Sequence, residues 1–159
     1  MAVSDGSFKL QRGASAAIIE GRGNQHSRAL IANRVPGRRT EHSPYRTEVA
    51  GVFGIVTYVL RIAAKYKITS DSIRVGLDGQ AVVEVLQNIN WIQPSRASYD
   101  LFQGIKGSID STKIDFEFFW VEGHQDEKYK AISYEGHLNI ACDSLAKTFW
   151  NETKGRNNH

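Results

Sequence analysis

The sequence predicts an α/β protein in which helices pack on a mixed β-sheet. Over the first 35 residues, short apolar segments alternate with turn residues, which is typical of an antiparallel meander. Farther along, helical periodicity alternates with short β-branched and aromatic runs, which is typical of strand–helix units. The chain has 159 residues and is 41% hydrophobic, so we expect one domain, residues 1–152, followed by a flexible polar tail, residues 153–159.

Three strands are expected first, at residues 2–8, 13–20 and 26–35. Asp5-Gly6-Ser7 consists of residue types that favour turns, so the first strand is expected to end there. The glycine-rich segment 21–24 is expected to turn the chain from the second strand into the third. Tight connections of this kind indicate antiparallel neighbours.

A long helix is expected next. Ser43-Pro44 is a helix-start signal, and apolar residues recur at three- and four-residue spacing from Val49 to Ala63. Beyond it we expect a strand at 72–77, helices at 81–86 and 99–109, a strand at 114–121 and a closing helix at 137–150. The polar segment 123–136 is expected to be a loop.

The bulk composition limits the classes of partner. There are 20 Lys and Arg against 17 Asp and Glu, with a formal charge of +3 and a pI near 9.0, which permits a polyanionic partner without requiring one. Cys142 is the only cysteine, so a reducing intracellular setting, cytoplasm or nucleus, is the simplest expectation. No apolar run approaches the roughly 18–20 residues that cross a bilayer, so we expect no membrane partner.

Four acidic residues lie where acids are costly. Asp5 is beside the apolar run of the first strand, Glu48 begins the apolar helix, Asp78 directly follows an apolar strand, and Asp143 is within the closing helix. A buried ionised carboxylate must be paired, neutralised or bound to metal. Lys or Arg partners are not obvious from the sequence, so metal is the simplest compensation. Two hard cations held by carboxylates activate a water and stabilise the leaving oxygen in phosphoryl transfer.

Each acid taken alone also has a structural explanation. Asp5 suits a turn, Glu48 suits the N-terminal end of a helix dipole, and Asp78 suits a helix N-cap. Asp143 is the most unusual of them, because core-type residues surround it in the closing helix. Asn139 lies four residues earlier and so shares its helix face. The set of acids is therefore more informative than any member.

The chain resembles ribonuclease H, in particular the domain that accompanies reverse transcriptases in retroelements. Five motifs carry the resemblance in the family's order: Ser4-Asp5-Gly6-Ser7, Arg46-Thr47-Glu48, Leu77-Asp78-Gly79-Gln80, Trp120-Val121-Glu122-Gly123-His124 and Asn139-Ile140-Ala141-Cys142-Asp143-Ser144-Leu145-Ala146. The resemblance implies a ribonuclease H-like fold. That fold is a five-stranded mixed sheet, three antiparallel strands and then two parallel ones, with helices packed on both faces.

The resemblance also implies an activity. Asp5, Glu48, Asp78 and Asp143 would bind two Mg²⁺ ions, for which Mn²⁺ can substitute, and His124 would assist proton movement and product departure. The implied reaction is hydrolysis of the RNA strand of an RNA/DNA hybrid, leaving a 5′-phosphate and a 3′-hydroxyl. We expect the isolated domain to be a monomer and a reverse transcriptase domain to be covalently linked upstream.

Five residues are expected to contact the substrate. Gly6 and Ser7 can offer backbone or hydroxyl contacts to the 2′-hydroxyl groups in the minor groove, and Gln80 matches the family's glutamine beside the third acid. Asn139 is the fourth expected contact. Tyr45 is the fifth, and it is expected to pack on a sugar or base.

The chain departs from the family in several places. Pro44 and Tyr45 stand where many cellular members carry an asparagine pair that grips nucleic acid, and Gly79 stands where serine is common. The stretch 79–99 has only Arg96 as a cation, so the Lys-rich protrusion of many free-standing members is absent. Segment 125–138 is longer than usual and is expected to be a solvated excursion.

These departures keep two alternatives open. One is a catalytically weak or inactive ribonuclease H-like module that binds nucleic acid or a protein partner. The other is a nuclease of the same fold that acts on double-stranded RNA or on a DNA end.

Overall fold

The computed structural model describes residues 1–21 and 27–154. Its elements are β1 (Ala2–Lys9), β2 (Arg12–Glu20), β3 (Arg28–Arg34), η1 (Arg39–Glu41), α1 (Pro44–Tyr66), β4 (Ser70–Leu77), α2 (Gln80–Gln87), η2 (Ile89–Trp91), α3 (Tyr99–Asp110), β5 (Lys113–Trp120), α4 (Gln125–Lys128) and α5 (Tyr134–Lys154). The turn expected at 22–24 and the tail residues 155–159 lie outside this range. Thr153 and Lys154, expected in the tail, belong to α5.

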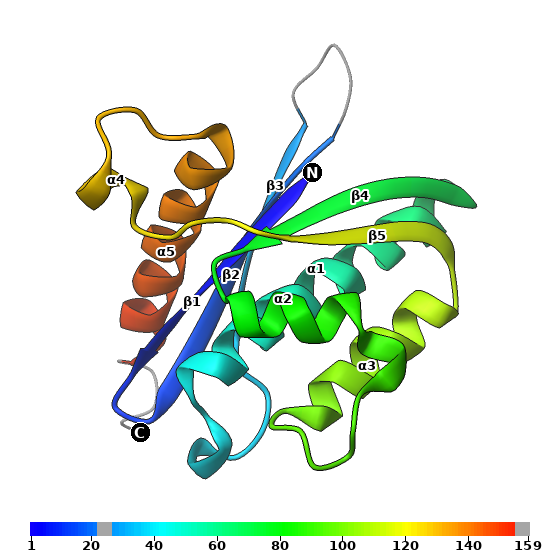
Figure 1. Cartoon of the computed structure of the whole chain (residues 1–159), viewed down its shortest axis with the longest axis horizontal. Helices are drawn as coiled ribbons and strands as arrows, with labels where there is room; N and C mark the ends of the chain where they lie inside the picture. The colour runs from blue at the N-terminus through cyan, green and yellow to red at the C-terminus, as the bar shows by residue number, and fades with distance from the viewer. Residues whose placement is uncertain (22–26, 155–159) are drawn as a thin grey trace.

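The sheet has the predicted mixed topology. Its strand order is β3-β2-β1-β4-β5 (Figure 1). The β1–β2 and β2–β3 pairs are antiparallel, and the β1–β4 and β4–β5 pairs are parallel. The fold class read from the sequence is therefore confirmed.

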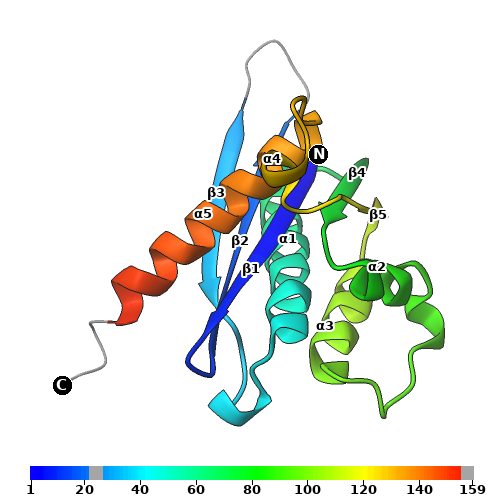
Figure 2. The same ribbon diagram turned by 60° about the vertical axis from the view of Figure 1, so that its left-hand side comes forward.

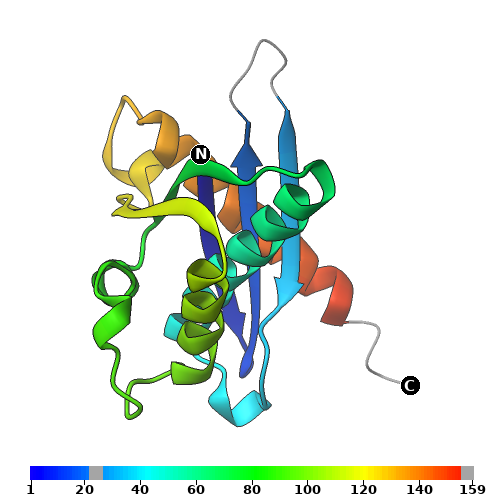
Figure 3. The same cartoon turned by 90° about the vertical axis from the view of Figure 1, so that its right-hand side faces the viewer.

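Helices cover both faces of the sheet because its side chains alternate along each strand. Ala2 and Ala17 belong to the large core that includes α1, whereas Val3 and Ile18 pack with Leu138 and Cys142 of α5. In Figure 2, α5 crosses one face, and in Figure 3, viewed from the other side, α1 crosses the opposite face. Even-numbered side chains of β1 therefore face α1, and odd-numbered ones face α5.

The core helix α1 begins where its sequence signal predicts. The Ser43 side chain accepts a hydrogen bond from Arg46 N at 3.0 Å, Pro44 occupies the first turn, and Lys67 ends the helix in the left-handed conformation. Within the described residues, α1 is the one helix long and apolar enough to cross a membrane, contrary to our expectation of no such run. In the fold, its apolar side chains pack in the core against the sheet and α3.

The first strand is longer than predicted. β1 continues through Asp5-Gly6-Ser7, and the turn falls at Leu10 and Gln11, whose φ values are 50° and 56°. Pairing with β2 persists to Lys9, so the sheet ladder overrides the local turn preference of Asp-Gly-Ser. Pairing with β4 covers only residues 2–4, so Asp5 is the first β1 residue beyond β4.

Segment 125–138 is more ordered than the predicted excursion. It contains α4, and α5 begins at Tyr134, three residues earlier than expected. Gln125 is buried, its Oε1 accepts hydrogen bonds from Ser133 N and Oγ at 3.0 and 3.1 Å, and its Nε2 donates to Glu122 O at 3.0 Å. This one amide supplies the internal hydrogen bonds that a polar composition alone did not reveal.

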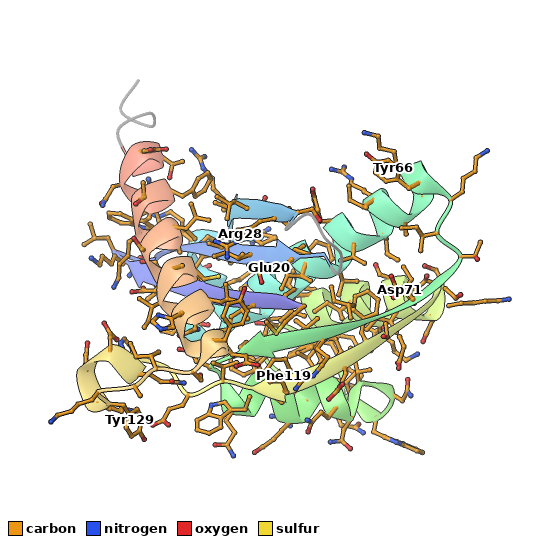
Figure 4. All side chains as sticks on the ribbon, turned by 90° about the horizontal axis from the view of Figure 1, so that it is seen from above. Glu20, Arg28, Tyr66, Asp71, Phe119 and Tyr129 are labelled. Carbon is orange, nitrogen blue, oxygen red and sulfur yellow. The ribbon has the colours of Figure 1, made fainter. Side chains whose placement is uncertain are left out.

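The start of α5 is tied to the sheet by polar contacts. The Glu20 carboxylate accepts hydrogen bonds from the Tyr134 hydroxyl and from Arg28 Nε, the latter at 2.8 Å. Figure 4 shows Glu20 and Arg28 side by side on their strands. These contacts join the end of β2, the start of β3 and the first turn of α5.

A buried arginine of α1 joins this helix to α3 on one side of the sheet. Arg46 is 4% exposed, and its guanidinium donates to both Asp100 oxygens of α3 at 2.7 and 2.6 Å and to Pro36 O at 2.9 Å. The ion pair joins α1 to α3, and the hydrogen bond to Pro36 O joins α1 to the loop that precedes it. This fork geometry is one that lysine cannot reproduce.

We expect Arg46→Lys to lower the free energy of unfolding by about 2 kcal/mol, because lysine cannot replace the hydrogen bonds that the buried Arg46 guanidinium donates to Asp100 and Pro36 O. Urea denaturation followed by circular dichroism measures this change. Lys106→Arg is the matched control, since Lys106 forms an i,i+4 pair with Asp110 at the surface of α3. Equal stability of the two variants would contradict a structural role for the Arg46 fork.

Candidate active site

The four predicted acids come from four different elements that meet where the sheet opens. Asp5 lies on β1 just past the end of its pairing with β4, and Asp78 follows Leu77, the last residue of β4. Glu48 lies one turn into α1, and Asp143 lies midway along α5. All of them are partly buried. The pairing of β1 with β4 ends at Ser4 and Leu77, so Asp5 and Asp78 both directly follow the last paired residues.

The four carboxylates are close enough for their charges to affect the pKa values of Asp5, Glu48 and Asp78. Burial, followed by the charges of Asp78, Asp143 and Glu48, raises the pKa of Asp5 to about 8. Burial and Asp78 raise the pKa of Glu48 to about 7. Burial also raises the pKa of Asp78, with Asp143 adding to the rise and His124 opposing it. A cluster of this kind is stabilised by protons or by cations.

Two glycines leave the room that the acids occupy. A Cβ at Gly79 would lie 1.5 Å from Glu48 Oε2, so Glu48 reaches across to the β4–α2 turn. A Cβ at Gly123 would lie 2.7 Å from Asp78 Oδ2, so the loop after β5 packs directly on Asp78. The absence of serine at position 79, noted in the sequence, thus gives the Glu48 carboxylate its place.

We expect Gly123→Ala to reduce catalysis about 100-fold, because a shift of roughly 1 Å in a catalytic group has an effect of that size. Asp78 is short, so it must move when a Cβ is added beside it. Steady-state cleavage kinetics measure the effect. Gly107→Ala is the control, because a Cβ there meets nothing within 4 Å. A Gly123→Ala enzyme as active as this control would contradict the packing argument.

Asp143 has a partner that the sequence reading missed. Lys147 forms an ion pair with Asp143 Oδ2, and the i,i+4 spacing within one helix is the signal that would have found it. Asp143 is also less enclosed than predicted. Leu138, Cys142 and Ala146 form the buried stripe of α5, and Asp143 lies at the edge of that stripe.

The residues fit a divalent cation in their chemistry. Asp78 Oδ1 is buried and has no hydrogen-bond partner within the described ranges, and a buried carboxylate oxygen of this kind is suited to bind a cation. Over those same ranges, no three His, Cys, Asp or Glu side chains are already gathered as a metal site. The acids repel one another, and a bound cation would offset that repulsion.

The similarity to known proteins is structural. No family model and no curated protein sequence matches the chain. Among solved structures, it matches the protease–reverse transcriptase of prototype foamy virus with a TM-score of 0.65, 15% identity and coverage of 92% of this chain and 20% of that one. It matches LC9-RNase H1, a type 1 RNase H with the type 2 active-site motif, with a TM-score of 0.62, 14% identity and coverage of 92% and 71%.

A third match is LC11-RNase H1, solved in complex with an RNA/DNA hybrid, with a TM-score of 0.53, 12% identity and coverage of 91% and 96%. The chain has a ribonuclease H-like fold. At these identities the likeness establishes the fold alone. The chain spans about a fifth of the length of the foamy virus protein that it matches.

In this ribonuclease H-like fold, His124 lies at the rim of the acidic cluster. It is exposed, adopts the left-handed conformation with φ 53° at the start of α4, and places Nδ1 3.6 Å from Glu127 Oε1. Its charge lowers the pKa of Asp78, so the imidazole is near the acids without being packed among them. That placement suits a group that moves toward the site, and its catalytic role stays a prediction.

Two of the expected substrate contacts are buried. Ser7 is 5% exposed and Asn139 is 2% exposed, so neither side chain is available to a nucleic acid. Both lie beneath the surface because α5 covers the β1 face on which Ser7 lies and buries its own Asn139. We therefore correct the predicted side-chain contacts of Ser7 and Asn139, whereas a backbone contact at Ser7 stays a prediction. The Nδ2 atom of Asn139 has no partner within the part of the chain that the structure describes.

Tyr45 has a packing role within the fold. Its ring packs against Phe102 with centroids 6.3 Å apart, and its buried hydroxyl has no hydrogen-bond partner among residues 1–21 and 27–154. The ring is thus part of the α1–α3 contact, but it is only partly buried and lines a pocket with Gln93 and Arg96, so its packing on a sugar or base stays a prediction. Gly6 is half-buried against Thr47, whereas Gln80 is exposed and donates to Glu84 Oε1 at 3.3 Å. Of the five expected contacts, Gln80 is the most accessible.

Proposed function

We propose that this ribonuclease H-like protein is a divalent-metal-dependent endonuclease that hydrolyses the RNA strand of RNA/DNA hybrids. The observation that carries the proposal is the convergence of Asp5, Glu48, Asp78 and Asp143 from four elements into one electrostatic cluster. Such a cluster destabilises the metal-free protein at neutral pH, because like charges are held close together in a partly desolvated site. A role in binding cations accounts for its presence.

The four carboxylates would hold two Mg²⁺ ions. When bound, such cations supply an activated water and stabilise the charge on the leaving oxygen. The protein itself contributes the placement: Asp78 Oδ1 is buried without a hydrogen-bond partner in the described chain, and Gly79 and Gly123 leave room for the carboxylates of Glu48 and Asp78. Lys147 balances the charge of Asp143 at the outer edge.

His124 would move the proton of the departing product. Its position on an exposed turn lets the imidazole approach the cluster and then return to solvent. Imidazole side chains commonly carry protons in catalysis near neutral pH. Hydrolysis at the phosphorus with departure of the 3′ oxygen would leave 5′-phosphate and 3′-hydroxyl ends.

The choice of substrate is supported by the matched structures. One matched protein is described with an RNA/DNA hybrid and another is a protease–reverse transcriptase, so we propose a hybrid substrate and an upstream reverse transcriptase. The protein would read the hybrid through its minor groove and 2′-hydroxyl groups, which distinguish RNA from DNA. Gly6 and Gln80 are the accessible candidates for that contact.

The test uses labelled RNA/DNA hybrid, double-stranded RNA and double-stranded DNA with Mg²⁺. Selective cleavage of the hybrid RNA strand, with 3′-hydroxyl products, is the expected result. Cleavage of a homoduplex in preference to the hybrid would replace the proposed substrate. Absence of cleavage on all three, together with no carboxylate-dependent Mn²⁺ binding in calorimetry, would favour a non-catalytic binding module.

A further inference from the structure

A second site lies at the end of the β1–β2 hairpin, under the C-terminal turns of α5. It is a pocket of about 250 Å³. Arg12, Arg34, Arg39 and His42 form its polar walls, and Trp150 lies on its apolar side. None of the four carboxylates lines it. The pocket is therefore separate from the acidic cluster.

The positive charge of this pocket is not neutralised by the surrounding chain. Among the ion pairs within residues 1–21 and 27–154, none involves Arg12, Arg34 or Arg39. No acidic residue lines the pocket. The nearby Glu41 is not among the lining residues; its carboxylate lies beside Gly37 and accepts a hydrogen bond from Arg38 N at 3.0 Å. Three arginines consequently line one small space, and none of them forms an ion pair within the described chain.

The pocket walls are held in place by hydrogen bonds. Gly13 N donates to His42 Nδ1 at 3.2 Å, and His42 Nε2 lies 3.3 Å from Gly37 O. Arg39 Nη2 donates to Leu10 O at 3.2 Å. The loop before α1 is thereby fastened to the β1–β2 hairpin. Of the three arginines, Arg39 is held by its own hydrogen bond, whereas Arg12 and Arg34 are positioned by the paired strands that carry them. Guanidinium groups suit phosphate oxygens because they donate two parallel hydrogen bonds.

The strand register relates the pocket to the acidic cluster. Asp5 pairs with Ala16, Lys9 pairs with Arg12, and Ala14 pairs with Arg34, so Asp5, Arg12 and Arg34 lie on the same face of the sheet. The four residues from Asp5 to Lys9 span about 13 Å along β1. Along a duplex this is roughly four nucleotides of one strand, at 3.4 Å for each.

We propose that this arginine pocket binds a backbone phosphate of the nucleic acid, about four nucleotides from the phosphate at the acidic cluster. The inference rests on the proposed function for the identity of the nucleic acid. The pocket supplies affinity without reading sequence, since phosphate contacts position a duplex and base contacts specify it. It would compensate for the missing basic protrusion between residues 79 and 99.

The test compares binding of an 18-base-pair fluorescent hybrid by proteins that all carry Asp78→Asn, so that the hybrid is not consumed. Arg12→Gln/Arg34→Gln is expected to weaken binding roughly 10-fold or more, the size of one lost charge-assisted hydrogen bond. The slope of log affinity against log salt is expected to fall by roughly 0.9 for each lost phosphate contact. Arg61→Gln, an exposed arginine on α1, is the control for lost charge.

The single variant Arg34→Gln keeps the test valid if the double variant unfolds, because Arg34 is exposed at the end of β3. A smaller loss of hybrid affinity in Arg34→Gln than in the double variant supports the pocket, provided that Arg34→Lys recovers part of that affinity. Affinity and salt slope equal to those of Arg61→Gln would overturn it. So would competition showing that inorganic phosphate, or vesicles containing phosphatidylserine, bind through these arginines while the hybrid does not.

Cleavage by proteins with Asp78 intact separates this inference from the proposed function. Arginine variants that raise KM for the hybrid and leave kcat unchanged support both. Arginine-dependent hybrid binding without any cleavage by the unmodified protein would overturn the proposed function and support the pocket. Normal cleavage by the unmodified protein, together with hybrid binding that does not depend on these arginines, would support the proposed function and overturn the pocket.

Discussion

Asp78→Asn will abolish Mg²⁺-dependent cleavage of the hybrid, with a loss of roughly 1,000-fold or more, the scale of removing a group that stabilises transition-state charge. Asp78 is the acid that raises the pKa of both Asp5 and Glu48, and its Oδ1 has no partner within the described chain. The change preserves shape and removes one charge from the centre of the cluster. Single-turnover cleavage with excess protein measures it.

Asp71→Asn is the matched control because it makes the same chemical change on the same strand. Asp71 is exposed at the start of β4, and Figure 4 shows it far from Tyr129 and the α4 loop. We expect Asp71→Asn to cleave at the wild-type rate. Cleavage by Asp78→Asn within a few-fold of this control would contradict the assignment of the acidic cluster as the active site.

Raising the pH from about 5 to about 9 will lower the melting temperature of the metal-free protein by roughly 5–10 °C, which corresponds to a few kcal/mol at this chain length. The pKa of Asp5 rises from 3.8 to about 8, and that of Glu48 from 4.5 to about 7. The folded state therefore binds these protons more tightly than the unfolded state. Their contribution is complete below the unfolded pKa values and is lost as the pH rises through about 7 and about 8.

Mg²⁺ will restore most of the lost stability at high pH, because it takes the place of the bound protons and binds the folded state. Asp5→Asn will flatten the pH profile in EDTA, since the neutral amide removes the most strongly shifted carboxyl group. Differential scanning fluorimetry with and without Mg²⁺ measures both effects, and Asp71→Asn should retain the wild-type slope. A melting temperature that stays constant or rises across this pH range would contradict the conclusion that burial and mutual repulsion raise the pKa values of these acids.

The site acids were predictable because they combine order along the chain with placement beside apolar segments. Asp78 shows this most clearly, since a carboxylate directly after Val75-Gly76-Leu77 must lie at the end of a buried strand. The contacts of Ser7, Asn139 and Tyr45 were not predictable in the same way. Their polarity suggested exposure, but α5 covers Ser7 and Asn139 and α3 contacts the Tyr45 ring, and such contacts depend on elements that are distant in the sequence.

The Arg46–Asp100 ion pair and the arginine pocket were also not predictable from the sequence, because both bring together residues that are distant along the chain. Arg46 and Asp100 are separated by 54 residues, and the pocket draws its arginines from β2, β3 and the loop before α1. Nothing in a local window indicates which distant residue faces which. The i,i+4 pair of Asp143 and Lys147 is the opposite case, because helical geometry alone places those side chains together.

By itself the sequence determined the order and type of the main elements, the mixed sheet and the acids of the cluster, because periodicity, turn chemistry and placement beside apolar runs are local properties. Tertiary structure alone decided that Asp5 lies within a strand, because the β2 ladder outweighs its turn preference. It also decided which polar side chains remain accessible and where unneutralised charge gathers. Those outcomes depend on long-range packing, which sums over neighbours that the chain order does not reveal.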